Sequence, residues 1–414
     1  MKAAVSKRKR NIFFIFSIVG PGLITVNAGN DAGGITTYAS VGASYGYKML
    51  WGLLLITFSL AVIQEMNSRM AVVTGKGLAD LIREKFGVKL TFFAMLVLFV
   101  ANFGVVLGDF AGVAASMELF GVSRYVSVPL IALIIWLLVT KGSYSKVEKV
   151  FLMFTFVFFT YIFSAFMAKP QWSTVFKSMG TPTLELNSGF ILALIGMIGT
   201  TITPYMQFYL QSSIVDKKIS IKDYKYEKLD VYLGAFWGNA VSFFIIVCTA
   251  ATLYKAGIAI TSAEQAAMAL KPLAGQYAFL LFGIGLFGAS VLAAAIIPLS
   301  TSYAICEAFG WESGVDYSYK EAPAFFTIYS LIIILGALLI LIPGISLMKL
   351  ILATQQIAGI LSPIILTFMI ILINDKRIMG RYVNSKTQNI ISWVTVAFII
   401  TLSLILFASS FIQI

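Results

Sequence analysis

The sequence predicts an all-α integral membrane protein, and three observations support this. Of its 414 residues, 59% are hydrophobic and only 12% are charged, whereas a soluble domain carries about 25% charged residues. Apolar runs long enough to cross roughly 30 Å of hydrocarbon as helices recur along the whole chain. These runs are continuous and lack the two-residue alternation of barrel strands. A soluble enzyme, a disordered chain and a disulfide scaffold are therefore excluded.

Eleven such runs are predicted to be transmembrane helices. They cover residues 12–41, 47–72, 90–118, 125–140, 147–168, 188–213, 230–254, 276–304, 323–343, 347–373 and 389–411. The hydrophilic stretches between them are too short to hold a domain core, so residues 1–414 should form one membrane domain. Within it we expect a basic terminus (1–11), a first five-helix group (12–168), a second five-helix group (188–373) and an additional helix (389–411).

The basic residues indicate how these spans are oriented. With the N-terminus inside, inner segments hold 22 Lys and Arg residues and outer segments hold 7. Cytoplasmic loops carry such an excess, so we predict a plasma-membrane protein with a cytoplasmic N-terminus and an extracytoplasmic C-terminus. The same bias explains the net charge of +12 and favours anionic lipid. Because the basic residues are scattered over separate loops, no nucleic-acid partner is expected, and nothing in the sequence indicates an obligate protein partner.

The first span is interrupted by polar residues and glycines. Gly20-Pro21-Gly22 is followed by Asn27-Ala28-Gly29-Asn30-Asp31-Ala32-Gly33-Gly34. A carboxylate in the middle of a spanning helix is costly and usually functional, and glycine tolerates non-helical backbone. An unwound turn at Asp31 would free carbonyl oxygens that a cation can satisfy and hydrocarbon cannot. This stretch fits a broken helix better than the alternative, a cleavable signal peptide with residues 7–10 as its basic region.

The sixth span has the same design. It reads Gly199-Thr200-Thr201-Ile202-Thr203-Pro204-Tyr205-Met206-Gln207. Pro204 cannot donate a backbone hydrogen bond and disfavours helix at Thr203. Either break alone could be structural, as a proline kink or a satisfied polar bridge. Together they occupy corresponding positions in two five-helix groups, which indicates inverted repeats of the LeuT-like kind with a binding site at the bilayer midplane.

Other polar residues lie inside the spans. Glu65 and Arg69 are four apart and can pair on one helix face, so we interpret them as a structural pair. Asp109 has no basic residue within a turn and either lines an ion path or is a buried, hydrogen-bonded carboxyl. Gln355 and Gln356 either reach the central site or bond a neighbouring helix. Three acids near span ends are expected to be solvated: Glu118, Asp230 and Glu307.

The chain contains two cysteines and no histidine. Cys248 and Cys306 lie in or beside apolar runs without a CxxC spacing, so buried inert thiols are expected. The absence of histidine removes the commonest transition-metal ligand and the usual proton relay near neutral pH.

Several motifs resemble those of the Nramp family of divalent metal transporters. They are Gly20-Pro21-Gly22 with Asp31-Ala32-Gly33-Gly34, residues 41–48 with Leu50-Trp51, Ile63-Gln64-Glu65 with Arg69, and residues 73–78. The similarity extends in order to about residue 372 and so covers most of the chain. The resemblance implies a divalent metal ion as substrate, held between the first and sixth helices.

The chain departs from the family's motifs at the site. Asp-Pro-Gly-Asn reads Asp31-Ala32-Gly33-Gly34 here, Met-Pro-His reads Thr203-Pro204-Tyr205, and Asp-x-x-Glu keeps only Asp109. Met206 lies downstream of the proline, so we do not equate it with the family methionine. Without the thioether and imidazole the site is all oxygen, which suits Mg²⁺, and also Mn²⁺. The pattern is most similar to the Nramp-related branch that carries magnesium, and the lost histidine and acid imply weak or absent proton coupling.

The sequence therefore predicts a transporter and not an enzyme, with no cofactor besides the transported ion. It would move Mg²⁺, and also Mn²⁺, by alternating access. A Na⁺-coupled amino-acid carrier is the alternative for the same architecture, although Asp31 would repel a substrate carboxylate; a membrane scaffold without flux is the third hypothesis. The expected metal ligands are Asp31, Asn27, Asn30, Thr203 and Gln207, with Asp109, Tyr205, Gln355 and Gln356 lining the pathway or supporting the ligands.

Overall fold

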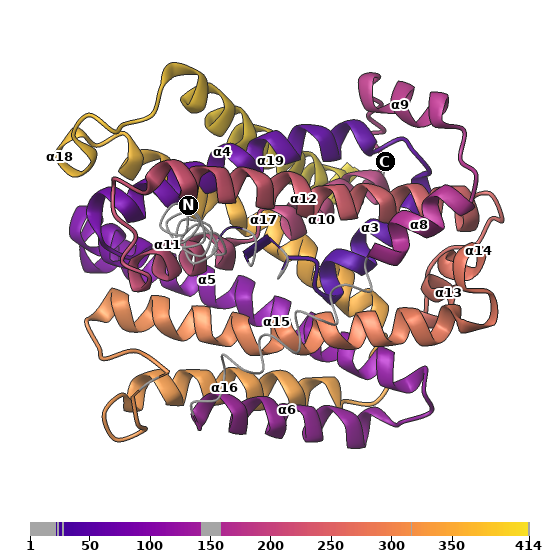
Figure 1. Cartoon of the computed structure of the whole chain (residues 1–414), viewed down its shortest axis with the longest axis horizontal. Helices are drawn as coiled ribbons and strands as arrows, with labels where there is room; N and C mark the ends of the chain where they lie inside the picture. Colours follow the sequence, from indigo (N-terminus) through magenta and orange to yellow (C-terminus); the bar gives the residue numbers. More distant parts are fainter. Residues whose placement is uncertain (1–21, 23–24, 27–28, 142–158, 316, 413–414) are drawn as a thin grey trace, which may run out of the picture.

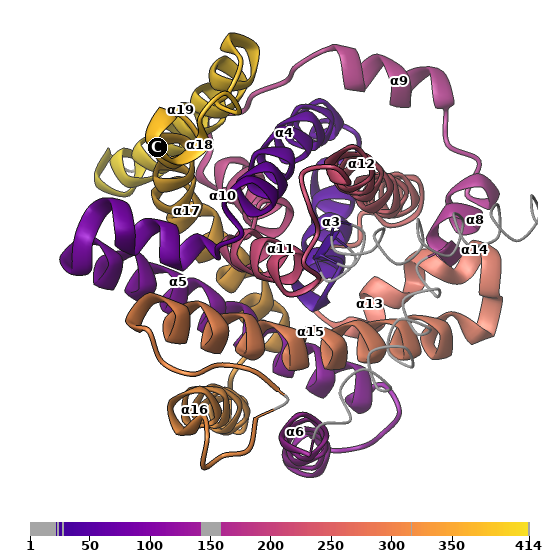
Figure 2. The ribbon, with the colours of Figure 1, turned by 60° about the vertical axis from the view of Figure 1, so that its left-hand side comes forward.

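The computed structural model describes residue 22 and residues 25–26, 29–141, 159–315 and 317–412, and these form helices without a β-strand. Most of the long helices run along the long axis of the molecule (Figure 1) and surround α3, which lies near the middle of the bundle (Figure 2). Eight described helices are long and apolar enough to cross a membrane, and Arg124–Thr140 is a shorter apolar helix. The prediction of an all-helical membrane protein is confirmed.

The helices follow the expected spans in order. The first part of the chain forms α3 (Ala32–Tyr45), α4 (Leu50–Thr74), α5 (Leu78–Glu118), α6 (Arg124–Thr140), α8 (Phe159–Met167) and α9 (Trp172–Gly180). The second part forms α10 (Ser188–Thr201), α11 (Pro204–Asp216), α12 (Tyr224–Thr249), η2 (Ala250–Tyr254), α13 (Ala263–Ala267), η3 (Met268–Leu270), α14 (Lys271–Ala274), η4 (Gly275–Tyr277), α15 (Ala278–Phe309), α16 (Pro323–Ile340), α17 (Leu347–Ile373), α18 (Lys376–Met379) and α19 (Lys386–Ile412). The expected spans 12–41 and 147–168 fall partly outside the described residues, so the total of eleven stays a prediction.

Two helices begin earlier than the apolar pattern predicts. α5 starts at Leu78 and bends at Gly87, whose φ of 74° is a conformation that favours glycine. α12 starts at Tyr224, so Asp230 lies within the helix and is only 1% exposed. The expectation that Asp230 is solvated is therefore wrong. Its Oδ2 accepts a hydrogen bond of 2.7 Å from the backbone N–H of Gly22, which fixes the segment before Asp31 to α12.

The other two acids at span ends lie at opposite ends of the bundle. Glu118 forms an ion pair of 2.6 Å with Arg124, as a surface carboxylate can. Glu307 is partly buried and accepts a hydrogen bond of 2.9 Å from the hydroxyl of Ser212, while its Oε2 is buried, so the expectation that it is solvated is wrong. Both cysteines are buried free thiols, as predicted.

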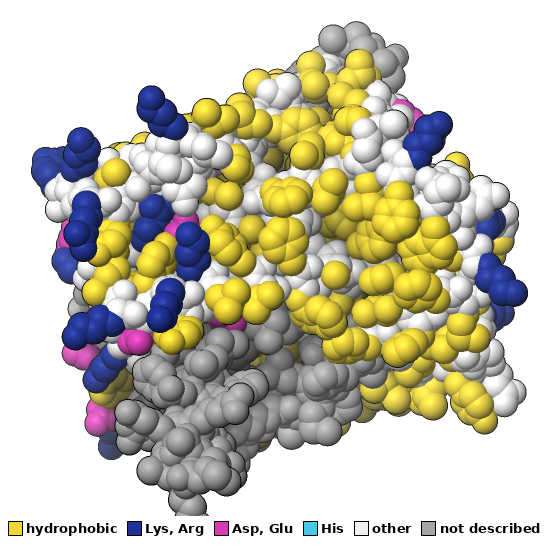
Figure 3. Space-filling model, turned by 45° about the horizontal axis from the view of Figure 1, so that its top comes forward, with side chains coloured by type: hydrophobic (Ala, Val, Ile, Leu, Met, Phe, Trp, Pro, Cys, Tyr) yellow, Lys and Arg dark blue, Asp and Glu magenta, His cyan; other side chains and the backbone are white. Residues whose placement is uncertain are grey.

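The surface is arranged as a membrane protein requires. Figure 3 shows a broad hydrophobic band between one end where Lys and Arg side chains gather and an opposite end with fewer of them. Exposed aromatic and aliphatic side chains that can contact lipid include Phe92, Val126, Phe163, Leu338 and Phe407. At the basic end, Lys85 pairs with Asp375 and Lys76 pairs with Glu84. The unequal ends fit the predicted charge bias across the bilayer.

Helices α10 and α17 approach each other through glycines. A Cβ atom on Gly199 would lie 2.5 Å from the backbone nitrogen of Gly359 and would also meet the carbonyl oxygen of Gln355. A Cβ atom on Gly359 would in turn meet the carbonyl oxygen of Ile195. Because these neighbours are backbone atoms, they cannot move aside as a side chain could. Only glycine lets the two helices come this close.

We therefore expect Gly199→Ala to lower the free energy of unfolding by about 1–3 kcal/mol, the usual cost of overpacking. The matched control is Gly104→Ala in the middle of α5, where the added Cβ would meet Thr354 at 3.7 Å, an ordinary contact. That control should be neutral or stabilising, because alanine has the higher helix propensity. Thermal unfolding of the two purified variants in detergent compares them, and equal stabilities would contradict this account of the packing.

Candidate metal site

The first helix break lies at Asp31, which is the N-cap residue of α3. Its backbone is extended (φ −73°, ψ −168°), and its Oδ1 accepts a hydrogen bond of 2.7 Å from the N–H of Gly34. Such a cap satisfies one of the free N–H groups at a helix start. Asp31 is 3% exposed, so the carboxylate is buried in the protein and does not face lipid. The predicted interruption is present.

The second break separates α10 from α11. Ile202 (φ −119°, ψ 60°) and Thr203 (φ −73°, ψ 140°) are not helical, and α11 begins at Pro204, where a missing N–H costs nothing. The hydroxyl of Thr203 donates to the carbonyl oxygens of Gly199 at 3.0 Å and Thr200 at 3.1 Å. The oxygen of this hydroxyl keeps its lone pairs, so it can still bind a cation.

The two breaks meet at the first turn of α3. A Cβ atom on Gly34 would lie 3.3 Å from the hydroxyl oxygen of Thr200, so that hydroxyl packs directly against the turn that Asp31 caps. It is buried and has no hydrogen-bond partner among the described residues. One turn further along α3, the Tyr38 hydroxyl shares a hydrogen bond of 2.7 Å with Thr201. Thr200 is not among the expected ligands, although it lies three residues before Thr203 in the same interrupted stretch.

Gln355 and Gln356 have separate surroundings. A Cβ atom on Gly33 would collide with the side-chain amide of Gln355, so Gln355 reaches the turn beside Asp31. Its Nε2 makes no hydrogen bond within the part of the chain that the structure describes. Gln356 packs against α10 instead, since a Cβ atom on Gly196 would lie 3.5 Å from its Cγ. Only the first of the two glutamines borders the helix break.

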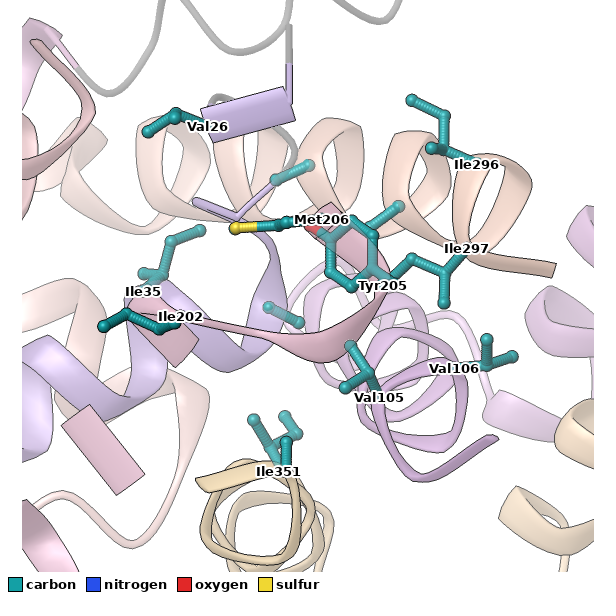
Figure 4. Packing of buried hydrophobic residues seen from close by; sticks show 14 of the residues in the cluster. Val26, Ile35, Val105, Val106, Ile202, Tyr205, Met206, Ile296, Ile297 and Ile351 are labelled. Carbon is teal, nitrogen blue, oxygen red and sulfur yellow. The ribbon is translucent and has the colours of Figure 1, made fainter. Parts of the chain in front are cut away.

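A second carboxyl and a tyrosine hydroxyl lie close to Asp31. Asp109 on α5 is fully buried, interacts electrostatically with Asp31 and lies near the backbone N–H of Ala32. Tyr205 is also fully buried, interacts electrostatically with both carboxyls and packs beside Ile297 and Val105 (Figure 4). In the described structure neither Asp109 oxygen nor the Tyr205 hydroxyl has a hydrogen-bond partner. Buried polar groups left in this state are costly unless a cation, water or a proton satisfies them.

For three of the predicted ligands, the described residues show no contact with Asp31, Asp109 or Tyr205. The Asn30 side chain turns to α12, where its Nδ2 donates to the Gly238 carbonyl at 3.5 Å and its Oδ1 accepts from Ser242 at 3.3 Å. The Gln207 side-chain amide is buried and makes no hydrogen bond with the described residues, while its carbonyl accepts from Asn67. Asn27 lies outside the described residues. Their role as ligands therefore stays a prediction.

Met206 lies closer to the break than its place in the sequence suggests. A Cβ atom on Gly29 would meet the terminal methyl group of Met206, with the sulfur 3.7 Å away. Figure 4 shows this side chain next to Tyr205 and on the side of Val26. The sequence could have indicated this, because Met206 is the third residue of α11 and the first turn of α11 faces the break at Asp31. Among the described residues no three His, Cys, Asp or Glu side chains cluster as a metal site, so hydroxyl, amide, carbonyl or thioether groups must complete any coordination.

Comparisons with known proteins point to one family. Residues 22–409 match the family described as natural resistance-associated macrophage protein-like, or Nramp. The chain is 25% identical to the divalent metal cation transporter MntH of Bacillus subtilis (strain 168), over 99% of this chain and 96% of that protein. It is 26% identical to the natural resistance-associated macrophage protein 2 homolog of Dictyostelium discoideum, over 96% of this chain and 64% of that protein.

Solved structures share the fold. The Eremococcus coleocola manganese transporter, in complex with an aromatic bis-isothiourea substituted compound, aligns with a TM-score of 0.75 at 18% identity and covers 96% of this chain and 88% of that chain. MhsT in complex with L-phenylalanine aligns with a TM-score of 0.51 at 14% identity, over 91% of this chain and 98% of that chain. The LeuT-like fold with broken first and sixth helices is thus confirmed. Because the family match spans nearly the whole sequence, this chain belongs to the Nramp family.

Proposed function

We propose that this protein carries divalent metal ions across the plasma membrane by alternating access, with Mg²⁺ as the main substrate and Mn²⁺ as a second one. Relatives over almost its full length are named as divalent metal cation transporters. The observation on which the proposal depends is the burial of the Asp31 carboxylate between two helix breaks. A buried carboxylate among unpaired oxygen atoms favours a cation as its partner.

The donor groups favour a hard cation. The side chains that border Asp31 offer carboxyl, hydroxyl and amide oxygens, and the chain has no histidine. Mg²⁺ binds oxygen with near-octahedral geometry and keeps several of its waters. Ala32, Gly33 and Gly34 follow Asp31 and leave little side-chain bulk at the turn. The proposed ligands are Asp31, Thr203 and the carbonyl groups of the two breaks, with Asn27, Asn30 and Gln207 as further candidates and Asp109, Tyr205, Gln355 and Gln356 along the path.

The direction of transport follows from the membrane potential. We place the basic end and the N-terminus in the cytoplasm, and the C-terminus outside. An inside-negative potential then drives a divalent ion inward with roughly 4.6 kcal/mol per 100 mV, twice the value for one charge. Proton coupling is weak or absent in this proposal, because the chain has no histidine and Asp109 is the one acid on its helix near the site.

Reconstitution into liposomes tests the proposal. Mg²⁺ and Mn²⁺ influx would be followed with fluorescent indicators under an inside-negative potential, and lumenal pH would be recorded at the same time. We expect both ions to enter without matching acidification. No influx of either ion would overturn the proposal, and uptake of a radiolabelled amino acid instead would identify the Na⁺-coupled carrier.

The position of Met206 supports a second candidate, a carrier selective for Mn²⁺ over Mg²⁺. A thioether favours softer transition metals over Mg²⁺, and this one packs against Gly29 at the first break. A manganese transporter shares the fold. However, a Cβ atom on Gly29 would meet the Met206 methyl group before the sulfur, which favours a packing role and the oxygen site.

Met206→Leu separates the two candidates, because it keeps the volume of the side chain and removes the sulfur. If the site uses oxygen, Mg²⁺ and Mn²⁺ influx should both stay within about twofold of the wild type. If sulfur binds the metal, Mn²⁺ influx should fall on the order of tenfold, which corresponds to about 1.4 kcal/mol of binding, while Mg²⁺ influx stays. Met179→Leu, on α9 away from the breaks, is the matched control.

A further inference from the structure

An apolar groove of about 310 Å³ lies between α4 and α19. Figure 2 shows α19 at the edge of the bundle beside α4. Helix α10 contacts both of them and closes the groove from behind, where Ile198 is only 1% exposed. No charged side chain among the described residues lines the groove. It is therefore a different kind of space from the metal site.

The polar side-chain groups in the lining have partners within the protein. The Thr395 hydroxyl donates to the Ser59 hydroxyl oxygen at 2.9 Å and to the Ile391 carbonyl oxygen at 2.8 Å. The Nε1 of Trp51 donates to the carbonyl oxygen of Thr183 at 3.0 Å. Water in the groove would gain little from groups that are already bonded, and apolar cavities stay dry.

The groove lies at the depth of lipid tails. α4 and α19 run in opposite directions, since Arg69 near the end of α4 bonds Asn384 just before the start of α19. Ser59 and Thr395 each come nine residues after the first residue of their helix, which is about 14 Å along the axis. Two points at this distance from opposite ends meet near the middle of a hydrocarbon core roughly 30 Å thick.

The groove is continuous with the surface that contacts lipid. Four of its side chains are 50% to 64% exposed, namely Leu55 and Phe58 on α4 and Ile390 and Val394 on α19. α19 is also the least buried of the eight described spans. The open side of the groove therefore faces hydrocarbon, where phospholipid tails are the molecules that can enter it.

The size of the groove fits an acyl chain better than a helix. A methylene group takes about 30 Å³, close to the share of one water in the liquid, so the groove holds roughly ten methylene groups. One helical turn, about 10 Å wide and 5.4 Å long, needs about 400 Å³. If the groove stayed empty, the side chains around it would lose dispersion contacts, and such packing is what holds helices together in a bilayer.

We propose that this groove binds one acyl chain of a membrane phospholipid, which fills the space between α4 and α19. The inference goes beyond the proposed function, because it holds whichever ion is carried. The chain lies against Leu55 and Phe58 on one wall and against Ile390 and Val394 on the other. It adds contacts that hold the peripheral α19 on the bundle, besides the hydrogen bond between the two hydroxyl groups.

Photolabelling in nanodiscs tests the proposal without any transport. The probe is a phosphatidylcholine with a diazirine in the terminal half of one acyl chain, and mass spectrometry locates the adducts. Leu331, Leu335 and Leu338 on α16 give the reference for ordinary lipid contact, because they are 46% to 56% exposed, nearly as much as the groove side chains. We expect residues 51–59 and 390–399 to carry at least about threefold more adduct per exposed side chain than these leucines. Equal labelling of the groove and α16 would overturn the proposal.

Two variants that fill the groove provide a second measurement. Val394→Trp and Leu55→Trp each add an indole ring from one wall and should lower labelling of the opposite wall at least about threefold. Leu338→Trp on α16 is the matched control and should leave the labelling of the groove unchanged. Unchanged labelling of the opposite wall in the folded groove variants would contradict the proposal.

Native mass spectrometry separates the acyl chain from a protein occupant. A monomer that retains phospholipid, and retains less of it in Val394→Trp, supports the acyl chain. A dimer that Val394→Trp dissociates would assign the groove to a second copy of this chain and would overturn the proposal.

Discussion

Replacing Asp31 with asparagine is expected to abolish metal influx while the protein still folds. The asparagine side-chain oxygen can accept the hydrogen bond from Gly34 that now caps α3, so the helix start is preserved and only the charge is lost. Removing one member of a buried charge pair costs about 3 kcal/mol or more, which is roughly 100-fold in apparent affinity. Asp31→Ala should lose the charge and the cap together, and should therefore also be less stable.

Influx of Mg²⁺ and Mn²⁺ into liposomes, together with thermal unfolding in detergent, measures both effects. Glu321→Gln is the control, because this acid is exposed in the loop before α16 and distant in sequence from both breaks. We expect it to transport as the wild type does. A folded Asp31→Asn variant with wild-type influx would show that the carboxylate does not bind the transported ion, and would remove the basis of the proposed function.

The fold was largely predictable because a bilayer restricts the choices. Apolar length alone located the described spans, and Pro204 and the glycines around Asp31 located the breaks, since these residue types interrupt a helix for local steric reasons. Helix starts were less predictable. The segment at 224–230 is helical although it is polar, and this places Asp230 against Gly22, because a helix can begin in the interface before the apolar run does.

The contacts within the site were not predictable to the same degree. Asn30 and Asp31 are adjacent in sequence, yet the Asn30 side chain bonds α12 while Asp31 caps α3. Gln355 and Gln356 are likewise adjacent, and only Gln355 reaches Gly33. Neighbours on a helix point about 100° apart, so which one faces the site depends on the rotation of α17 against α3. Tertiary packing sets the rotation of α17, here through its glycine contact with α10. The sequence around Gln355 and Gln356 alone does not predict that rotation.

The Arg69–Glu65 pair is confirmed and has more partners than the sequence predicts. Arg69 donates to Glu65 at 3.2 Å and to Asn384 at 2.6 Å, and also to the carbonyl groups of Tyr382 and Val383. Glu65 accepts further hydrogen bonds from Gln388 and Tyr224. The two side chains are 8% and 2% exposed. The pair therefore links α4 to α12, to the loop before α19 and to α19 itself.

Replacing Arg69 with methionine should lower the free energy of unfolding by about 3–5 kcal/mol, because it leaves the Glu65 charge buried without its cation. Adding Glu65→Gln should restore part of this loss, since the second change removes the uncompensated charge and the two effects are coupled. Chemical unfolding in detergent measures Arg69→Met, Glu65→Gln and the double variant. Arg377→Gln is the control, because Arg377 also pairs with a carboxylate, Asp375, but is 82% exposed, and exposed pairs contribute little. Two results would contradict this account: equal losses of stability in Arg69→Met and Arg377→Gln, or a loss in the double variant equal to the sum of the two single losses. Either would show that the buried ion pair does not stabilise the protein. The link between α4 and α19 would then have to be assigned to their apolar contacts.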